Sequence, residues 1–193
     1  PRLNAAGKID HAQPALDLIL PTDDTRARDL LRHLDLLNTT RQAETTRVMQ
    51  EAEKIIDAGS SPLIFVANLT WPAGVVGLVA SRLSEKFARP AIVVGGNGQH
   101  AVGSARSAVA VNILEVVRHG QEHLLKFGGH ARAAGFSVVA DKLPALQATL
   151  HAFAQHLAPA AEAILYADAC LATHLVGWPL LHQLERFAPF GQG

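Results

Sequence analysis

The chain has 193 residues, 49% of them hydrophobic, which is enough to bury a core in one medium domain or two small ones and excludes disorder as its main state. Its 17 basic and 17 acidic side chains balance, which excludes a protein that binds polyanions through bulk positive charge. The single cysteine, Cys170, excludes a disulfide scaffold and indicates a reducing, cytoplasmic compartment. The apolar runs are far too short to cross a bilayer, so no membrane contact is expected.

Residues 1–60 are predicted to form a helical connector. Apolar residues at helical spacing predict a short helix at 12–20 and a long one that begins after Pro21 and ends at Gly59. Thr22 is the predicted N-cap of the long helix, followed by two aspartates that favour the positive end of its dipole.

Residues 61–158 are predicted to form a compact mixed α/β domain, because short apolar strands alternate with helices. The predicted strands are 63–67, 91–94, 101–107 and 136–139, and the predicted helices are 74–87, 112–118 and 142–157. Residues 159–193 are too few for a core of their own, and a strand near 164–166 and a helix at 179–187 are expected there. We interpret the chain as a piece of a longer polypeptide.

Charged residues are unevenly distributed along the chain. Residues 82–132 carry seven Lys or Arg against three Asp or Glu, a local excess of four positive charges. The glycine-rich strings lie in the same block. A phosphate site needs positive charge beside accessible backbone, although a solvated basic surface is the plainer interpretation.

The string FGGHARAAG at 127–135 is the most informative. Gly128 and Gly129 allow close backbone approach, their amides can form an anion-binding nest, and a following helix start would add its dipole. His130 would then donate to a phosphate oxygen. The alternative is a glycine turn with an ordinary surface histidine.

Two further strings support a phosphate site more weakly. In GSARS at 103–107, Ser104 and Arg106 are two apart in a predicted strand and therefore share a face, where a hydroxyl and a guanidinium fork suit a phosphate. In the predicted helix 74–87, the small residues Gly74 and Gly77 favour close packing over ligand binding.

The string HGQEH at 119–123 matches a zinc-peptidase pattern. That chemistry needs a continuous helix and a third ligand, whereas Gly120 weakens the helix and no partner segment stands out. We therefore expect no metal ligands in this chain.

Taken together, the strings resemble one known family. They are PRLNAAGK at 1–8, GVVGLVASRL at 74–83, GSARS at 103–107, FGGHA at 127–131 and PFGQG at 189–193. In this order they resemble RecJ, the bacterial single-strand-specific 5′ to 3′ DNA exonucleases of the DHH phosphoesterase superfamily. The resemblance covers nearly the whole chain.

The resemblance implies an architecture and a set of partners. A metal-bearing DHH domain precedes the connector in that family, 61–158 is the DHH-associated domain, and 159–193 leads into a DNA-binding OB fold. The family hydrolyses phosphodiesters with Mn²⁺ or Mg²⁺ in DNA repair and recombination. This chain has no Asp-His-His string, so the metal is expected in the DHH domain, and the chain alone is expected to be inactive.

The resemblance also implies roles for particular residues. Ser104 and Arg106, with Arg2 from the connector, would hold the 5′ phosphate of single-stranded DNA, and His130 on its glycines would contact the phosphate at the scissile bond. Arg132 stands where the family usually has an apolar residue, which makes it either an added phosphate contact or a surface feature.

Two other functions fit parts of the pattern. One is a DHH phosphodiesterase that acts on oligoribonucleotides or cyclic dinucleotides, and the other is a non-catalytic nucleic-acid-binding module. The first shares the glycine-histidine string but normally lacks the lead into an OB fold. The second is distinguished by the absence of an Asp-His-His string upstream of this chain.

Overall fold

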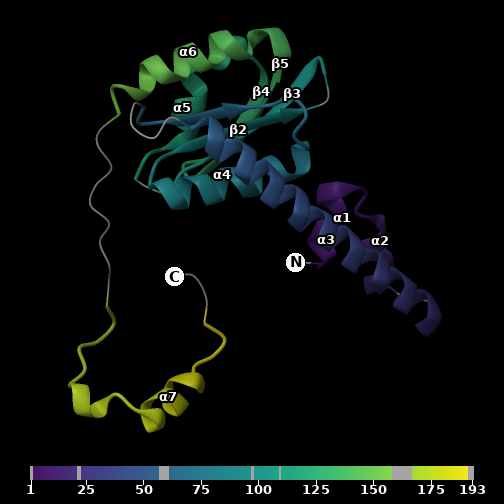
Figure 1. Ribbon diagram of the computed structural model, residues 1–193, viewed down its shortest axis with the longest axis vertical. Coiled ribbons are helices and arrows are strands. Elements are labelled where there is room, and N and C mark those ends of the chain that lie inside the picture. Colours follow the sequence, from purple (N-terminus) through teal and green to yellow (C-terminus); the bar gives the residue numbers. More distant parts are fainter. Residues whose placement is uncertain are drawn as a thin grey trace. The chain divides into compact units, whose positions relative to one another are not determined.

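The structure, a computed structural model shown in Figure 1, describes residues 2–20, 23–56, 61–96, 98–108, 110–157 and 167–190. The chain divides into two compact units, Pro1–Ala161 and Glu162–Gly193. Helices and one mixed sheet make up the first unit, which confirms the predicted α/β class. Within the described ranges, no helix is long and apolar enough to span a membrane.

Three helices open the first unit: α1 (Arg2–Ile9), α2 (Gln13–Ile19) and the long α3 (Asp24–Ile55). The carboxylate of Asp23 caps α3 by accepting from the backbone N–H of Arg26 at 2.8 Å, whereas the predicted cap, Thr22, lies outside the described residues. The three helices share a small apolar cluster of Ala5, Ala6, Ala15, Leu34 and Leu37. Helix α1 was not predicted, because it buries two alanines and so shows no clear apolar period.

The core of the unit is a five-stranded sheet in the order β1-β2-β3-β5-β4. Its strands are β1 (Ile64–Ala67), β2 (Ala91–Gly96), β3 (His100–Arg106), β4 (Leu124–His130) and β5 (Ala133–Val139). Strand β1 pairs with β2 in parallel, and all other neighbours are antiparallel. All four predicted strands are present, and β1 and β4 form the two edges.

Strand β4 is the main departure from the sequence prediction. Residues 127–135 were expected to form a glycine turn and a helix start, but the structure continues β4 through His130, turns at 131–132 and returns as β5. The reason is that β4 is exposed over nearly its whole length, so its sequence shows no apolar alternation. Its pairing with β5, Gly128 opposite Gly135 and His130 opposite Ala133, fixes it as a strand.

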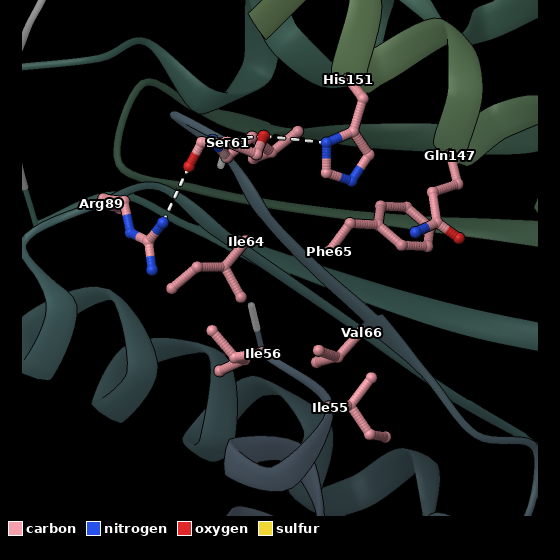
Figure 2. Close-up of a pocket in the computed structure, with 10 residues that line it drawn as sticks. Ile55, Ile56, Ser61, Ile64, Phe65, Val66, Arg89, Gln147 and His151 are labelled. Carbon is pink, nitrogen blue, oxygen red and sulfur yellow. Dashed lines mark hydrogen bonds between the residues drawn. The ribbon is translucent and has the colours of Figure 1, made fainter. Parts of the chain in front are cut away.

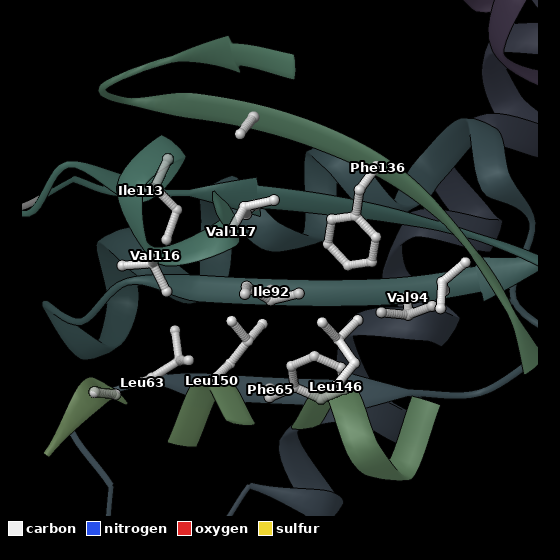
Figure 3. Packing of buried hydrophobic residues seen from close by; sticks show 14 of the residues in the cluster. Leu63, Phe65, Ile92, Val94, Ile113, Val116, Val117, Phe136, Leu146 and Leu150 are labelled. Carbon is white, nitrogen blue, oxygen red and sulfur yellow. The ribbon is translucent and has the colours of Figure 1, made fainter. Parts of the chain in front are cut away.

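Helices cover both faces of the sheet (Figure 1). On one face, α5 (Ile113–His119) and α6 (Leu143–Ala154) pack on alternate strand residues, as Figure 3 shows for Phe65, Ile92 and Phe136. On the other face, α4 (Ala73–Phe87) and the C-terminal part of α3 cover the remaining residues of β1 and β2. Helix α4 reaches β3 but leaves β5 and β4 exposed on this face.

The connections and the second unit complete the chain. Short 3₁₀ turns lie at Gln121–His123 and Ala140–Lys142 in the first unit and at Thr173–Leu175 in the second, which also contains α7 (Trp178–Glu185). The predicted helix at 179–187 is therefore present, beginning one residue earlier and ending two residues earlier than predicted. The strand expected near 164–166 lies outside the described residues.

We expect Gly103→Ala to lower the free energy of unfolding by about 1–3 kcal/mol, the usual cost of overpacking a core. A Cβ at this position would collide with the ring of Phe136 on the neighbouring strand. Gly128→Ala is the matched control, because no atom lies within 4 Å of its added Cβ. Urea unfolding of both variants measures the difference, and equal losses would contradict this packing.

Candidate functional site

Ser104 and Arg106 lie together on β3, as predicted. Both point to the α4 side of the sheet, and the Arg106 Nη1 donates to the Ser104 Oγ at 2.8 Å. The same Nη1 also lies 2.8 Å from the Ala105 carbonyl oxygen and 3.4 Å from that of Ala134. The guanidinium is therefore held in one orientation by the strand itself and by its neighbour β5.

The guanidinium of Arg106 is half-buried and has no counter-charge among the described residues. No carboxylate in the described part of the chain forms an ion pair with it, and its Nε and Nη2 donate to no group there. Burial lowers the pKa of Arg106, because desolvation disfavours its charged form. A partly buried cation with two unused donors is suited to an anionic ligand.

Gly77 of α4 leaves room for this pair. A Cβ on Gly77 would lie 3.1 Å from the Arg106 Nη2 and 3.1 Å from the Ser104 Oγ. The sequence pattern predicts a packing role for Gly77 and does not reveal its position beside the two site residues. The small residue at helical spacing was the signal, but only the crossing of α4 over β3 shows which side chains it faces.

His130 lies at the end of β4 on the same face of the sheet. The register places His130 and Arg106 on either side of Ala133 in one row across three strands. Two interstrand spacings separate their Cα atoms by about 10 Å. The imidazole is exposed and makes no hydrogen bond to the described residues, so both of its nitrogens are open to a ligand.

Gly128 and Gly129 are strand residues, which corrects the expected nest and helix dipole. Gly128 is exposed, with open space where a side chain would be. Gly129 has φ +145°, and a Cβ there would collide with the carbonyl oxygen of Ala133. These glycines therefore expose backbone and fit the turn into β5, without a helix N-terminus behind them.

Arg2 is not joined to this cluster. It lies on α1, and its Nε is 2.6 Å from the Asp35 carboxylate of α3 in an exposed ion pair. No hydrogen bond or ion pair connects it to Ser104 or Arg106. Arg132 lies in the turn after His130, where its carbonyl oxygen accepts from the Ser107 N–H at 3.0 Å and its side chain is exposed.

The described residues contain no group of three or more His, Cys, Asp or Glu side chains that could hold a metal ion. The HGQEH string is not one helix, since α5 ends at His119 and a 3₁₀ turn follows Gly120. The ring of His119 stacks on Phe153 at 3.5 Å, and His123 hydrogen-bonds Thr149. Both histidines therefore have structural contacts, and the residues described here do not fit a divalent metal.

A separate cavity of about 150 Å³ lies along β1 (Figure 2). The Ser61 Oγ is 2.8 Å from the His151 Nδ1, and the Arg89 Nη1 donates to the Ser61 carbonyl oxygen at 2.8 Å. The Ser61 Oγ also accepts from the Leu63 N–H. None of the described residues that line the cavity carries a carboxylate to orient the imidazole. Among the described residues, these contacts therefore connect residue 61 to α6 and do not form a catalytic triad.

Comparisons with known proteins give consistent results. The DHHA1 domain family matches residues 61–156. The single-stranded-DNA-specific exonuclease RecJ of Bacillus subtilis is 38% identical over 160 residues, which cover 81% of this chain and 20% of that protein. The chain thus spans about a fifth of the length of this relative.

Solved structures agree with the sequence matches. RecJ from Thermus thermophilus in complex with Mn²⁺ is 29% identical and has a TM-score of 0.87, with 99% of this chain and 28% of that chain covered. The Mg²⁺ complex of the same protein has a TM-score of 0.86 at 29% identity, with 99% and 30% covered.

We expect His151→Gln to flatten the pH dependence of stability. Burial lowers the pKa of His151, so the unfolded chain binds a proton at higher pH than the folded one. Stability is therefore lost as the pH falls through the ordinary histidine value of about 6.5. Urea unfolding at about pH 8 and about pH 5.5 should show a smaller difference in the variant. His156 is exposed just beyond α6, so His156→Gln should show the pH dependence of the wild type. If His151→Gln also keeps the wild-type pH dependence, burial of His151 is not its cause.

Proposed function

The chain belongs to the DHHA1-domain family and is related to RecJ over most of its length, and from this premise we propose that it is the substrate-binding part of a single-strand-specific 5′ to 3′ DNA exonuclease. The observation that carries the proposal is Arg106. Its half-buried guanidinium has no carboxylate partner in the described part of the chain and is held beside the hydroxyl of Ser104, an arrangement suited to receive a phosphate. That phosphate is the 5′ end of the DNA strand.

In this proposal His130 contacts the phosphate at the scissile bond. It shares a face and a cross-strand row with Arg106, so a strand whose end is bound at Arg106 passes over Ala133 toward the imidazole. A hydrogen bond from His130 would stabilise the charge that develops on the phosphate during hydrolysis. The exposed Gly128 and Gly129 let the DNA backbone approach β4.

Arg2 and Arg132 have lesser roles. The ion pair of Arg2 with Asp35 is exposed on both sides, and such pairs contribute about 0–1 kcal/mol, so Arg2 can exchange Asp35 for the 5′ phosphate at low cost. Arg132 follows His130 in the turn and is exposed, which supports a supplementary phosphate contact.

We assign the metal to another part of the polypeptide. RecJ has been solved with Mn²⁺ and with Mg²⁺, whereas the described residues of this chain offer no cluster for either ion. A DHH domain would hold the metal, a following OB fold would bind DNA, and the present domain would position the substrate between them. The role is in DNA repair and recombination, and the exposed free Cys170 is compatible with the reducing cytoplasm.

Arg106→Ala should weaken binding of 5′-phosphorylated single-stranded DNA about 10- to 100-fold, since a hydrogen bond to a charged group contributes about 1.5–3 kcal/mol. Fluorescence anisotropy of the 193-residue chain at low salt measures this. Arg118→Ala removes an arginine from α5, on the opposite face of the sheet, and should bind as the wild type. An equal effect of both variants, or no preference for the 5′ phosphate, would contradict the proposed phosphate site.

The 193-residue chain with Mn²⁺ should not cleave DNA, because its described residues hold no metal cluster. The intact parent protein should degrade long single-stranded DNA and not a dinucleotide. Gel analysis of end-labelled substrates distinguishes the outcomes. Full manganese-dependent cleavage by the 193-residue chain alone would contradict the assignment of the metal to another domain. Preference of the parent protein for a dinucleotide would favour the alternative function, that of an oligonucleotide phosphodiesterase.

A further inference from the structure

A second part of the sheet surface lies beside the proposed phosphate site. Helix α4 leaves the far ends of β3, β5 and β4 uncovered on its side of the sheet. We call this surface the open face; its residues are His100, Val102, Gly135, Ser137, Lys126 and Gly128. It is continuous with Ser104, Arg106 and His130, because all of these residues alternate onto the same side of their strands.

The rows across the sheet define the geometry of the open face. The row beside His130 contains Ser104, Gly135 and Gly128, and the next contains Val102, Ser137 and Lys126. Gly128 and Gly135 leave the backbone uncovered. A Cβ added to Gly128 would have no atom within 4 Å, and a Cβ added to Gly135 would be near only the Gly103 carbonyl oxygen, at 3.7 Å. The result is a groove of about 350 Å³ floored by backbone and bordered by the exposed side chains of Lys126 and Val102.

Charge on this side of β3, β5 and β4 has one sign. Its ionisable side chains are those of Arg106, His130, Lys126 and His100, and no Asp or Glu is present on these strands. Lys126 is exposed and forms no ion pair with the described residues. An exposed, positively charged sheet surface with few large side chains is suited to bind single-stranded nucleic acid.

We propose that the open face is a second nucleotide subsite, in which Lys126 binds a backbone phosphate of the DNA strand and the glycine floor with Val102 receives a base. The subsite takes a nucleotide beyond the one at His130. Lys126 and His130 are four residues apart on β4, about 14 Å at the rise of a strand, so they bind different phosphates of one strand. This inference rests on the proposed function, since it extends the same DNA path.

The test compares ligands of different length on the 193-residue chain. Thymidine 5′-monophosphate fills only the site at Ser104 and Arg106, whereas a 5′-phosphorylated oligothymidine of about five nucleotides also reaches the open face. Lys126→Gln should weaken binding of the oligonucleotide about three- to tenfold and leave the mononucleotide unchanged. The slope of log affinity against log salt should fall by about 0.7, the value for one phosphate contact on a single strand.

Three variants make the result specific. Lys126→Arg should restore most of the affinity, because it keeps the charge. Lys142→Gln removes an exposed lysine at the start of α6, in the opposite layer, and should have no effect. Gly128→Val should weaken oligonucleotide binding with an unchanged unfolding midpoint, because its side chain enters the groove and meets no protein atom within 4 Å of the Cβ.

The outcomes separate the two proposals. If the wild type binds the 5′-phosphorylated strand and Lys126→Gln loses no more than Lys142→Gln, the open face is not a nucleotide subsite, and the phosphate site at Arg106 stands. If Gly128→Val binds as tightly as the wild type, the base does not lie on the glycine floor. If the wild type binds neither ligand, the proposed function and this inference are both wrong.

Discussion

The antiparallel pairing of β5 with both β3 and β4 is the constraint on which the site depends. It opposes Arg106 to Ala133 on one side and His130 to Ala133 on the other, so two basic side chains from distant parts of the sequence share a row. Successive strand residues alternate between faces, and a shift of one residue in either register would move one of them to the opposite face of the sheet. The register is fixed by the apolar residues of the same strands, above all Phe136 over Gly103. The packing of the core therefore also sets the positions of Arg106 and His130.

Small residues recur wherever this site needs access. Gly77 lets α4 cross β3 without displacing Arg106, and Gly128 and Gly135 leave the neighbouring sheet surface bare. Each of them loses more backbone conformational freedom on folding than a residue with a side chain would. Arg106 adds a further cost, because its guanidinium is partly desolvated and no described residue supplies a counter-charge. These features disfavour stability, leave room for an anion and lie on one face of the sheet. They therefore support the proposal of a phosphate site there.

Sequence patterns predicted the elements that bury apolar residues. Helix α3, helix α4 and the strands β1, β2, β3 and β5 all have an apolar period that follows from one buried face or from full burial. The placement of Ser104 and Arg106 on one face followed from strand alternation alone. Strand β4 escaped prediction because its exposed residues have no such period, and the two glycines were interpreted as a turn. Helix α1 escaped because its buried contacts are two alanines.

The sequence by itself determined the fold class, the family and the residue types of the proposed phosphate site, because strings such as GSARS and FGGHA can be recognised without knowing how the chain folds. Only the tertiary structure decided which of these residues lie near one another. It joined His130 to Arg106 across β5, kept Arg2 on α1 beside Asp35, and exposed Lys126 on the same face as the glycines. The physical reason is that pairing between strands and the crossing of α4 are long-range contacts, set by packing over the whole sheet and absent from any local pattern of residues.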